Sequence, residues 1–148
     1  MKKLVIFGSG KIGHDALIFL GSENIECFCD NNLSLKGTER YGKKIRSFEE
    51  LRTNSKDVIV VIAVAGFVSY DIAKQCEENG VSDYLIYTFL RETYPQFERA
   101  QMLAYLEDAM NRLDIRKNIY LQRARELEGQ VGYFRRHADI RHMSPAKG

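Results

Sequence analysis

The chain has 148 residues, with an apolar fraction of 45% and a charged fraction of 28%. These fractions are close to those of soluble globular domains, so they exclude a disordered, collagenous or mainly membrane-embedded chain, and the length indicates one compact domain with an appendage. The formal charge of +2 is far below the basic excess with which nucleic-acid-binding domains neutralise phosphates, so we expect no nucleic-acid partner.

The cysteines and the N-terminus indicate a reduced, cytoplasmic protein. The 3 cysteines cannot all pair internally, and no Cys-x-x-Cys or Cys/His pair has ligand spacing, so we expect buried thiols and no metal site. The apolar stretch before Gly8 is too short for a signal peptide. The longest apolar run, residues 58–67, is about half the length that spans a bilayer, so we expect no membrane span.

Residues 1–90 predict an α/β fold, because β-rich apolar runs alternate with helical patterns. One run, residues 58–64, has no polar alternation, which is typical of a strand buried on both faces of a parallel sheet. With right-handed crossovers, the pattern gives a doubly wound, five-stranded parallel Rossmann-like sheet of order 3-2-1-4-5. The predicted strands are residues 4–7, 25–29, 42–46, 58–64 and 84–87.

Two helices carry boundary signals in the sequence. Ser47, followed by Glu50, predicts the N-cap of a brief helix with an acidic first turn. A longer helix is expected to start with Ser69 or Asp71 as its cap and to end at Gly80, since glycine adopts the left-handed conformation that closes helices.

Residues 91–143 predict a helical extension, followed by a tail at 144–148. Beyond Pro95 there is no proline, and no glycine before Gly129, so the region can be almost continuously helical. Steps of four and three between apolar residues are typical of a helix hairpin packed on its own sheet, or of a coiled coil that joins two copies into a homodimer. The stripe consists of Leu106, Met110, Leu113, Tyr120, Ala124, Leu127, Val131, Phe134 and Ala138.

One motif carries chemistry, a G-x-G-x-x-G pattern between the first strand and the first helix. It reads Gly8-Ser9-Gly10-Lys11-Ile12-Gly13. Gly8 permits the tight turn, Gly10 lets a pyrophosphate approach the backbone, and Gly13 lets the helix lie close to the sheet. The amides and the dipole at the start of this helix favour a phosphate anion, to which Lys11 can add a charge. The alternative is that the glycines only form a tight turn.

A carboxylate stands where such a site holds a ribose. Asp30 follows Gly13 by 17 residues at the end of the second strand, where it can bond a ribose 2′-hydroxyl and would repel a 2′-phosphate, so NAD is preferred to NADP. Asn31 is a second candidate for the ribose. The base is expected near the end of the central strand, at Val64, Ala65 and Gly66.

Catalytic candidates are few. Tyr70 and Lys74 have the Tyr-x-x-x-Lys spacing of short-chain dehydrogenases and sugar-nucleotide epimerases, in which the lysine lowers the pKa of the tyrosine. In that family the pair comes much later in the chain and the glycine pattern is Gly-x-x-x-Gly-x-Gly, so chance spacing on a helix explains the match better. A small NAD-dependent epimerase or dehydrogenase is therefore an alternative function only.

Several segments of the first ninety residues together resemble a known family of modules. The family is the Rossmann-like NAD- or nucleotide-sugar-binding module of glycan-modifying proteins, which include PglD-type sugar acyltransferases and LicD-type phosphotransferases. The segments that carry the resemblance are residues 3–13, 28–32, 41–45, 47–51 and 58–64.

The resemblance implies a function as well as a fold. It implies a ligand at the carboxyl ends of the strands, close to the glycine motif and Asp30. It also implies an accessory, non-catalytic domain of a transferase that modifies a cell-surface polysaccharide or lipid. Residues 142–148 resemble the segment that precedes the catalytic part of LicD-type proteins. The resemblance implies either that a catalytic domain follows Gly148 or that the chain is a free-standing accessory domain.

Overall fold

The computed structural model of the protein describes residues 3–111. The strands are β1 (Lys3–Phe7), β2 (Ile25–Cys29), β3 (Glu39–Arg40), β4 (Lys43–Arg46), β5 (Val58–Ile62) and β6 (Tyr84–Ile86). The helices are α1 (Lys11–Leu20), α2 (Phe48–Thr53), α3 (Gly66–Glu78), α4 (Tyr87–Thr93) and α5 (Arg99–Asn111). Short 3-10 turns lie at η1 (Ser22–Asn24), η2 (Leu33–Leu35) and η3 (Ser55–Asp57).

The α/β class is confirmed, with a sheet of six strands rather than five. Its order is β3-β4-β2-β1-β5-β6, in which β3 pairs antiparallel with β4 and the other neighbours are parallel. The extra strand has only two residues, Glu39 and Arg40, both exposed, so it has no apolar pattern to reveal it. Tyr41 and Gly42, with φ values of 54° and 79°, form the two-residue turn of this edge hairpin.

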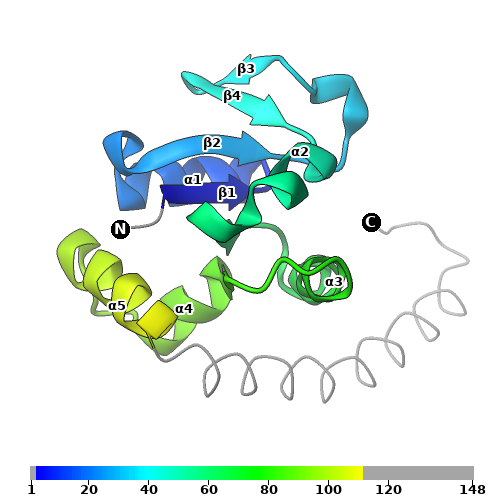
Figure 1. Ribbon diagram of the computed structural model, residues 1–148. Coiled ribbons are helices and arrows are strands. Elements are labelled where there is room, and N and C mark those ends of the chain that lie inside the picture. Colours follow the sequence, from blue (N-terminus) through cyan, green and yellow to red (C-terminus); the bar gives the residue numbers. More distant parts are fainter. Residues whose placement is uncertain (1–2, 112–148) are drawn as a thin grey trace, which may run out of the picture. The chain divides into compact units, whose positions relative to one another are not determined.

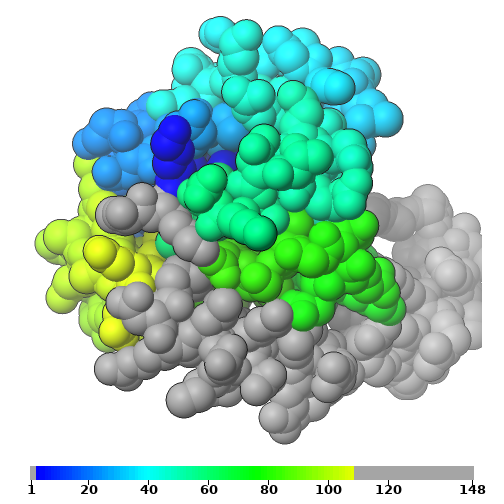
Figure 2. Space-filling model, in the orientation of Figure 1, coloured from blue at the N-terminus to red at the C-terminus, as the bar shows by residue number. Residues whose placement is uncertain are grey.

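Helices cover both faces of the sheet. Figure 1 shows α2 in front of β1 and β2 and α1 behind them, and in Figure 2 the side chains of α2 and α3 form neighbouring parts of the front surface. Every residue of β5 is buried, as expected of a central parallel strand. The front face packs Val5, Phe7, Val60 and Ile62 against Leu51 of α2 and Ile72, Ala73 and Cys76 of α3.

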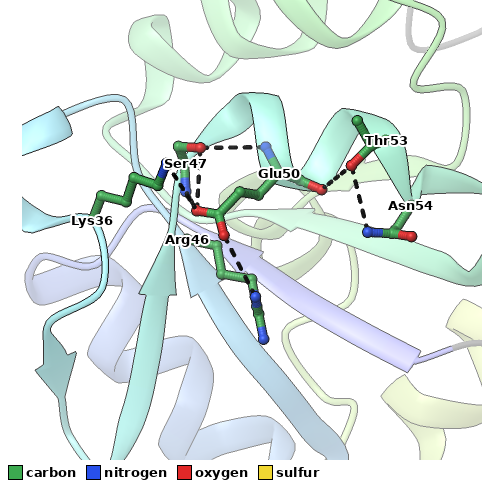
Figure 3. A network of polar contacts seen from close by, with 6 residues as sticks. All are labelled: Lys36, Arg46, Ser47, Glu50, Thr53 and Asn54. Atoms are coloured by element: carbon green, nitrogen blue, oxygen red, sulfur yellow. Dashed lines mark hydrogen bonds and ion pairs between the residues drawn. The ribbon is translucent and has the colours of Figure 1, made fainter.

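The short helix α2 begins as its sequence predicts. The Ser47 hydroxyl accepts from the Glu50 amide at 3.2 Å, while a Glu50 carboxylate oxygen accepts from the Ser47 amide at 3.1 Å, which is a complete capping box. Arg46 and Lys36 lie 3.6 and 4.0 Å from the same carboxylate (Figure 3). These contacts anchor the chain where it leaves the edge of the sheet for the front face.

The predicted start of α3 is wrong. The helix begins at Gly66, and its N-cap residue Ala65 makes no side-chain hydrogen bond. Ser69 lies inside the first turns, where its hydroxyl donates to the carbonyl oxygens of Val64 and Ala65 at 3.3 and 3.2 Å. The predicted end is confirmed, because Gly80 follows the helix with a φ of 75°.

The helical extension is described only in its first part. In α5, Met102 and Leu106 are each 1% exposed, and this helix contacts α1. Residues 112–148 lie outside the described part of the chain, and with them the predicted stripe from Leu113 onward, so the homodimer stays a prediction. Among residues 3–111, no helix is both long and apolar enough to cross a membrane.

The three cysteines are buried and unpaired, which confirms the expectation for them. Cys27 and Cys29 point to the front face of the sheet, and Cys76 packs there from α3. Burial raises the pKa of the Cys76 thiol to about 12, so this thiol stays protonated at neutral pH and packs as a small apolar side chain.

Candidate functional site

The loop between β1 and α1 lies where the strand order reverses, between β1 and β5. Gly8 has a φ of 115°, and a Cβ atom on it would stand 2.5 Å from the Ala63 carbonyl oxygen and 2.7 Å from a Val64 methyl. Only glycine fits this turn and this approach to the segment after β5. In open α/β sheets, ligands bind in the crevice outside such a reversal.

Gly13 and Gly10 have opposite surroundings. A Cβ on Gly13 would lie 1.9 Å from the Gly8 carbonyl oxygen, so α1 packs directly on the loop. A Cβ on Gly10, by contrast, would meet nothing within 4 Å, and the residue is exposed. The space in front of Gly10 is open to a ligand.

The first amides of α1 follow directly after Gly10. The N-cap residue is Gly10, which has no side chain to cap the first amides of the helix. The His14 amide donates to the Gly10 carbonyl oxygen at 2.9 Å, which is the first hydrogen bond of the helix. The preceding amides, of Lys11, Ile12 and Gly13, have no carbonyl one turn earlier in the helix. Together with the helix dipole, they form a site with the chemistry to bind a phosphate.

Asp30 ties the end of β2 to the glycine loop. One carboxylate oxygen accepts from the Ser9 hydroxyl at 2.6 Å and the Ser9 amide at 3.2 Å, and the other accepts from the Asn32 amide at 2.9 Å. Burial by itself would raise the pKa of Asp30, but these hydrogen bonds and the charge of Arg40 outweigh it and hold the pKa below its usual value. The carboxylate therefore stays ionised and keeps acceptor capacity beside the loop.

Asn31 is oriented away from the loop. Its side-chain amide exchanges two hydrogen bonds with Gln75 of α3, at 2.8 and 3.0 Å. This pair joins the loop after β2 to α3. Of the two predicted ribose contacts, Asp30 is therefore the residue that contacts the glycine loop.

The edge hairpin also reaches the glycine loop, which sequence reasoning missed. Arg40 Nη1 donates to the Ser9 carbonyl at 2.9 Å. At the turn, the Tyr41 ring stacks on His14 of α1, with centroids 3.8 Å apart and planes 6° from parallel. The only signal in the sequence was the Tyr-Gly turn, and nothing in it indicated the partners.

The other predicted residues lie around this loop or on α3. Lys11 is exposed at the first turn of α1 and Ile12 is half-buried. Val64 is half-buried, and Ala65 and Gly66 are exposed where the chain enters α3.

The predicted catalytic pair is on α3. Tyr70 packs, half-buried, against the core of the front face, whereas Lys74 is exposed. The tyrosine ring thus contributes to packing. The catalytic role of this pair stays a prediction that rests on the spacing of the two residues.

A second polar contact joins α1 to α4. Tyr87 Oη donates to Asp15 Oδ2 at 2.6 Å, joining α4 to α1 across 72 residues of chain. Burial and the Asp15 carboxylate both raise the pKa of Tyr87, so the phenol is a fixed donor. In the part of the chain that the structure describes, no group of three His, Cys, Asp or Glu residues has the geometry to hold a metal ion.

Comparisons with known proteins identify one family. A family model described as "C2185-like, N-terminal" matches residues 1–87. The comparison with curated proteins finds no match.

Two solved structures are similar at low identity. UDP-D-quinovosamine 4-dehydrogenase from Vibrio fischeri is 21% identical, with 57% of this chain and 76% of that chain covered and a TM-score of 0.43. A protein called RSP, solved with β-NAD+ and operator DNA, is 13% identical, with a TM-score of 0.44. The match covers 74% of this chain but only 61% of that chain.

Proposed function

The chain belongs to the C2185-like, N-terminal family, and from the geometry of its glycine loop we propose that it binds a nucleotide, either NAD or a nucleotide-sugar. The diphosphate lies against the amides of Lys11, Ile12 and Gly13. The observation that carries the proposal is the open space at Gly10 between two glycines whose own Cβ positions are blocked. A turn-forming role explains Gly8 and Gly13, but it requires no glycine at Gly10.

The ribose of the ligand bonds Asp30. Its carboxylate already accepts from the Ser9 hydroxyl, which can rotate away when a ribose hydroxyl replaces it. Because this ionised carboxylate would repel a 2′-phosphate, NAD is favoured over NADP. The base lies toward Val64, Ala65 and Gly66, on the far side of the reversal point.

The resemblance to modules of glycan-modifying proteins supports a wider proposal. On that basis, the domain is an accessory nucleotide-binding domain of a transferase that modifies a cell-surface polysaccharide or lipid. Its ligand then either marks the substrate or regulates the transferase. This wider role depends on the nucleotide site and fails with it.

Calorimetric titration of the protein with NAD, NADP and UDP-glucose tests the nucleotide site. Gly10→Ala adds a methyl group that meets no protein atom within 4 Å, so we expect the variant to melt like the wild type and to bind its ligand at least about tenfold more weakly. The matched contrast is Gly13→Ala, whose methyl group collides with the loop and is expected to lower the melting temperature.

Two results would contradict the proposal. One is the absence of heat with all three nucleotides, which would leave the glycines a turn-forming role. The other is unchanged affinity in a folded Gly10→Ala variant, which would place the ligand elsewhere.

A further inference from the structure

We propose that the hollow between α1 and α4 binds the sugar of a nucleotide diphosphate sugar, an inference that rests on the proposed nucleotide site and chooses between its two ligand classes. The hollow has a volume of about 420 Å³ and is lined by residues that include Lys11, Ile12, Asp15, Tyr87, Thr88 and Arg91. The hollow is shallow and open to solvent, and its volume lies within the range of small-ligand sites, ~300–1,000 Å³.

The hollow shares two residues with the proposed phosphate site. Lys11 and Ile12 line the hollow, and their amides begin α1 next to Gly10. A group attached to a diphosphate at these amides would therefore extend along α1 toward α4. The ribose carboxylate, Asp30, lies on the other side of the loop, at the end of β2, so the two ends of such a ligand have separate places.

The polar groups of the hollow suit hydroxyl groups. Tyr87 holds Asp15 through Oδ2, which leaves Oδ1 as an acceptor. Arg91 supplies donors, and its guanidinium carbon lies 3.8 Å from the centre of the Phe19 ring, which fixes its position over α1. A sugar hydroxyl both donates and accepts, so carboxylates and cations on one wall can bind a row of them.

The charge balance of the hollow favours a neutral, polar group. Two cations, Lys11 and Arg91, line it together with two carboxylates, Asp15 and Glu92. A group that carries hydroxyls can pair with both signs of charge, whereas a charged group is repelled by one of them.

The test compares each nucleoside diphosphate with its sugar. UDP, UDP-glucose, ADP and ADP-glucose are titrated calorimetrically into the wild-type protein, and the ratio of the two dissociation constants is taken for each base. For the base that binds, we expect the sugar to tighten binding at least about tenfold. Asp15→Ala should bring this ratio close to one, and Tyr87→Phe should lower it, while the affinity for the bare diphosphate stays unchanged.

Tyr84→Phe is the matched control. Tyr84 is a buried tyrosine that packs in the core of the front face, away from the hollow, so its substitution should leave the ratio unchanged. Thermal melts of each variant establish that it is folded.

The outcomes separate the two proposals. If the diphosphate and its sugar bind equally well to the wild type, or if the ratio survives in a folded Asp15→Ala variant, the sugar site is refuted while the nucleotide site stands. If neither diphosphate nor sugar binds, the sugar site is refuted, and the titration with NAD decides whether the nucleotide site stands.

Discussion

Asp30 is the residue at which three parts of the protein meet. It accepts from the glycine loop and from the turn after β2, and Arg40 of the edge hairpin lies close enough to lower its pKa. These contacts preorganise the loop in the absence of a ligand. They also make the carboxylate a stabilising group of the folded state.

The pH dependence of stability tests this role. In an unfolded chain, the pKa of aspartate is about 3.9, and the folded state lowers it, so ionised Asp30 stabilises the fold above about pH 4. The contribution disappears as the pH falls through the folded pKa. We expect Asp30→Asn to melt at a lower temperature than the wild type at pH 7 and the difference to shrink below about pH 4. A difference that does not change between pH 7 and pH 3 would show that the charge of Asp30 is not what stabilises the loop.

The residues of the site differ in how well the sequence predicts them. The glycine motif and Asp30 were predicted because a local pattern fixes their role at the end of a strand. Arg40 and the pair of Asp15 and Tyr87 were not, because their contacts span 31 and 72 residues of chain and no short pattern encodes them. The site thus combines a local sequence motif, which can be predicted, with tertiary contacts, which cannot.

The helix α2 shows how a short helix is stabilised. It has six residues, too few to be stable by itself, and its capping box satisfies backbone amides at the point where the chain leaves β4. Figure 3 shows that Arg46 and Lys36 point toward the same Glu50 carboxylate. Because these ion pairs are at the surface, the cap contributes more than they do.

Substitution of the cap residue measures its contribution. Ser47 is 3% exposed, so Ser47→Ala leaves the Glu50 amide without its acceptor and should destabilise the protein by ~1 kcal/mol. Urea unfolding followed by circular dichroism gives this difference. Ser22→Ala, at an exposed serine of η1, is the control and should change stability by less than about 0.5 kcal/mol. Equal effects of the two substitutions would argue against the capping role.

The elements that were mispredicted have a common cause. Ser69 or Asp71 is predicted as the cap because serine and aspartate are good caps, yet the N-cap of α3 is Ala65, four residues before Ser69, with no side-chain hydrogen bond. The strand β3 was missed because it is short and exposed at the sheet edge. In both places tertiary position decided the boundary, whereas the buried strands β1, β2 and β5 were visible in their apolar runs.

The helical extension begins as part of the sheet domain. Arg99 donates to the carbonyl oxygens of Phe19 and Ile18 at 2.9 and 2.8 Å, which caps the last turn of α1. Met102 and Leu106 are buried in the same region. Leu106, the first apolar residue of the predicted stripe, therefore packs within its own chain.

This placement leads to a prediction that separates internal packing from association. Leu106→Ala removes a fully buried side chain, so we expect it to destabilise the fold by ~2–5 kcal/mol without changing the mass measured by light scattering at about 100 μM. Glu107→Ala, at the exposed neighbouring position, is the control and should change neither. A seam between two copies would give the opposite result, a lower mass in Leu106→Ala with an unchanged unfolding midpoint for the domain. The same two measurements on Leu113→Lys and Leu127→Lys would then decide whether the remainder of the stripe joins two copies.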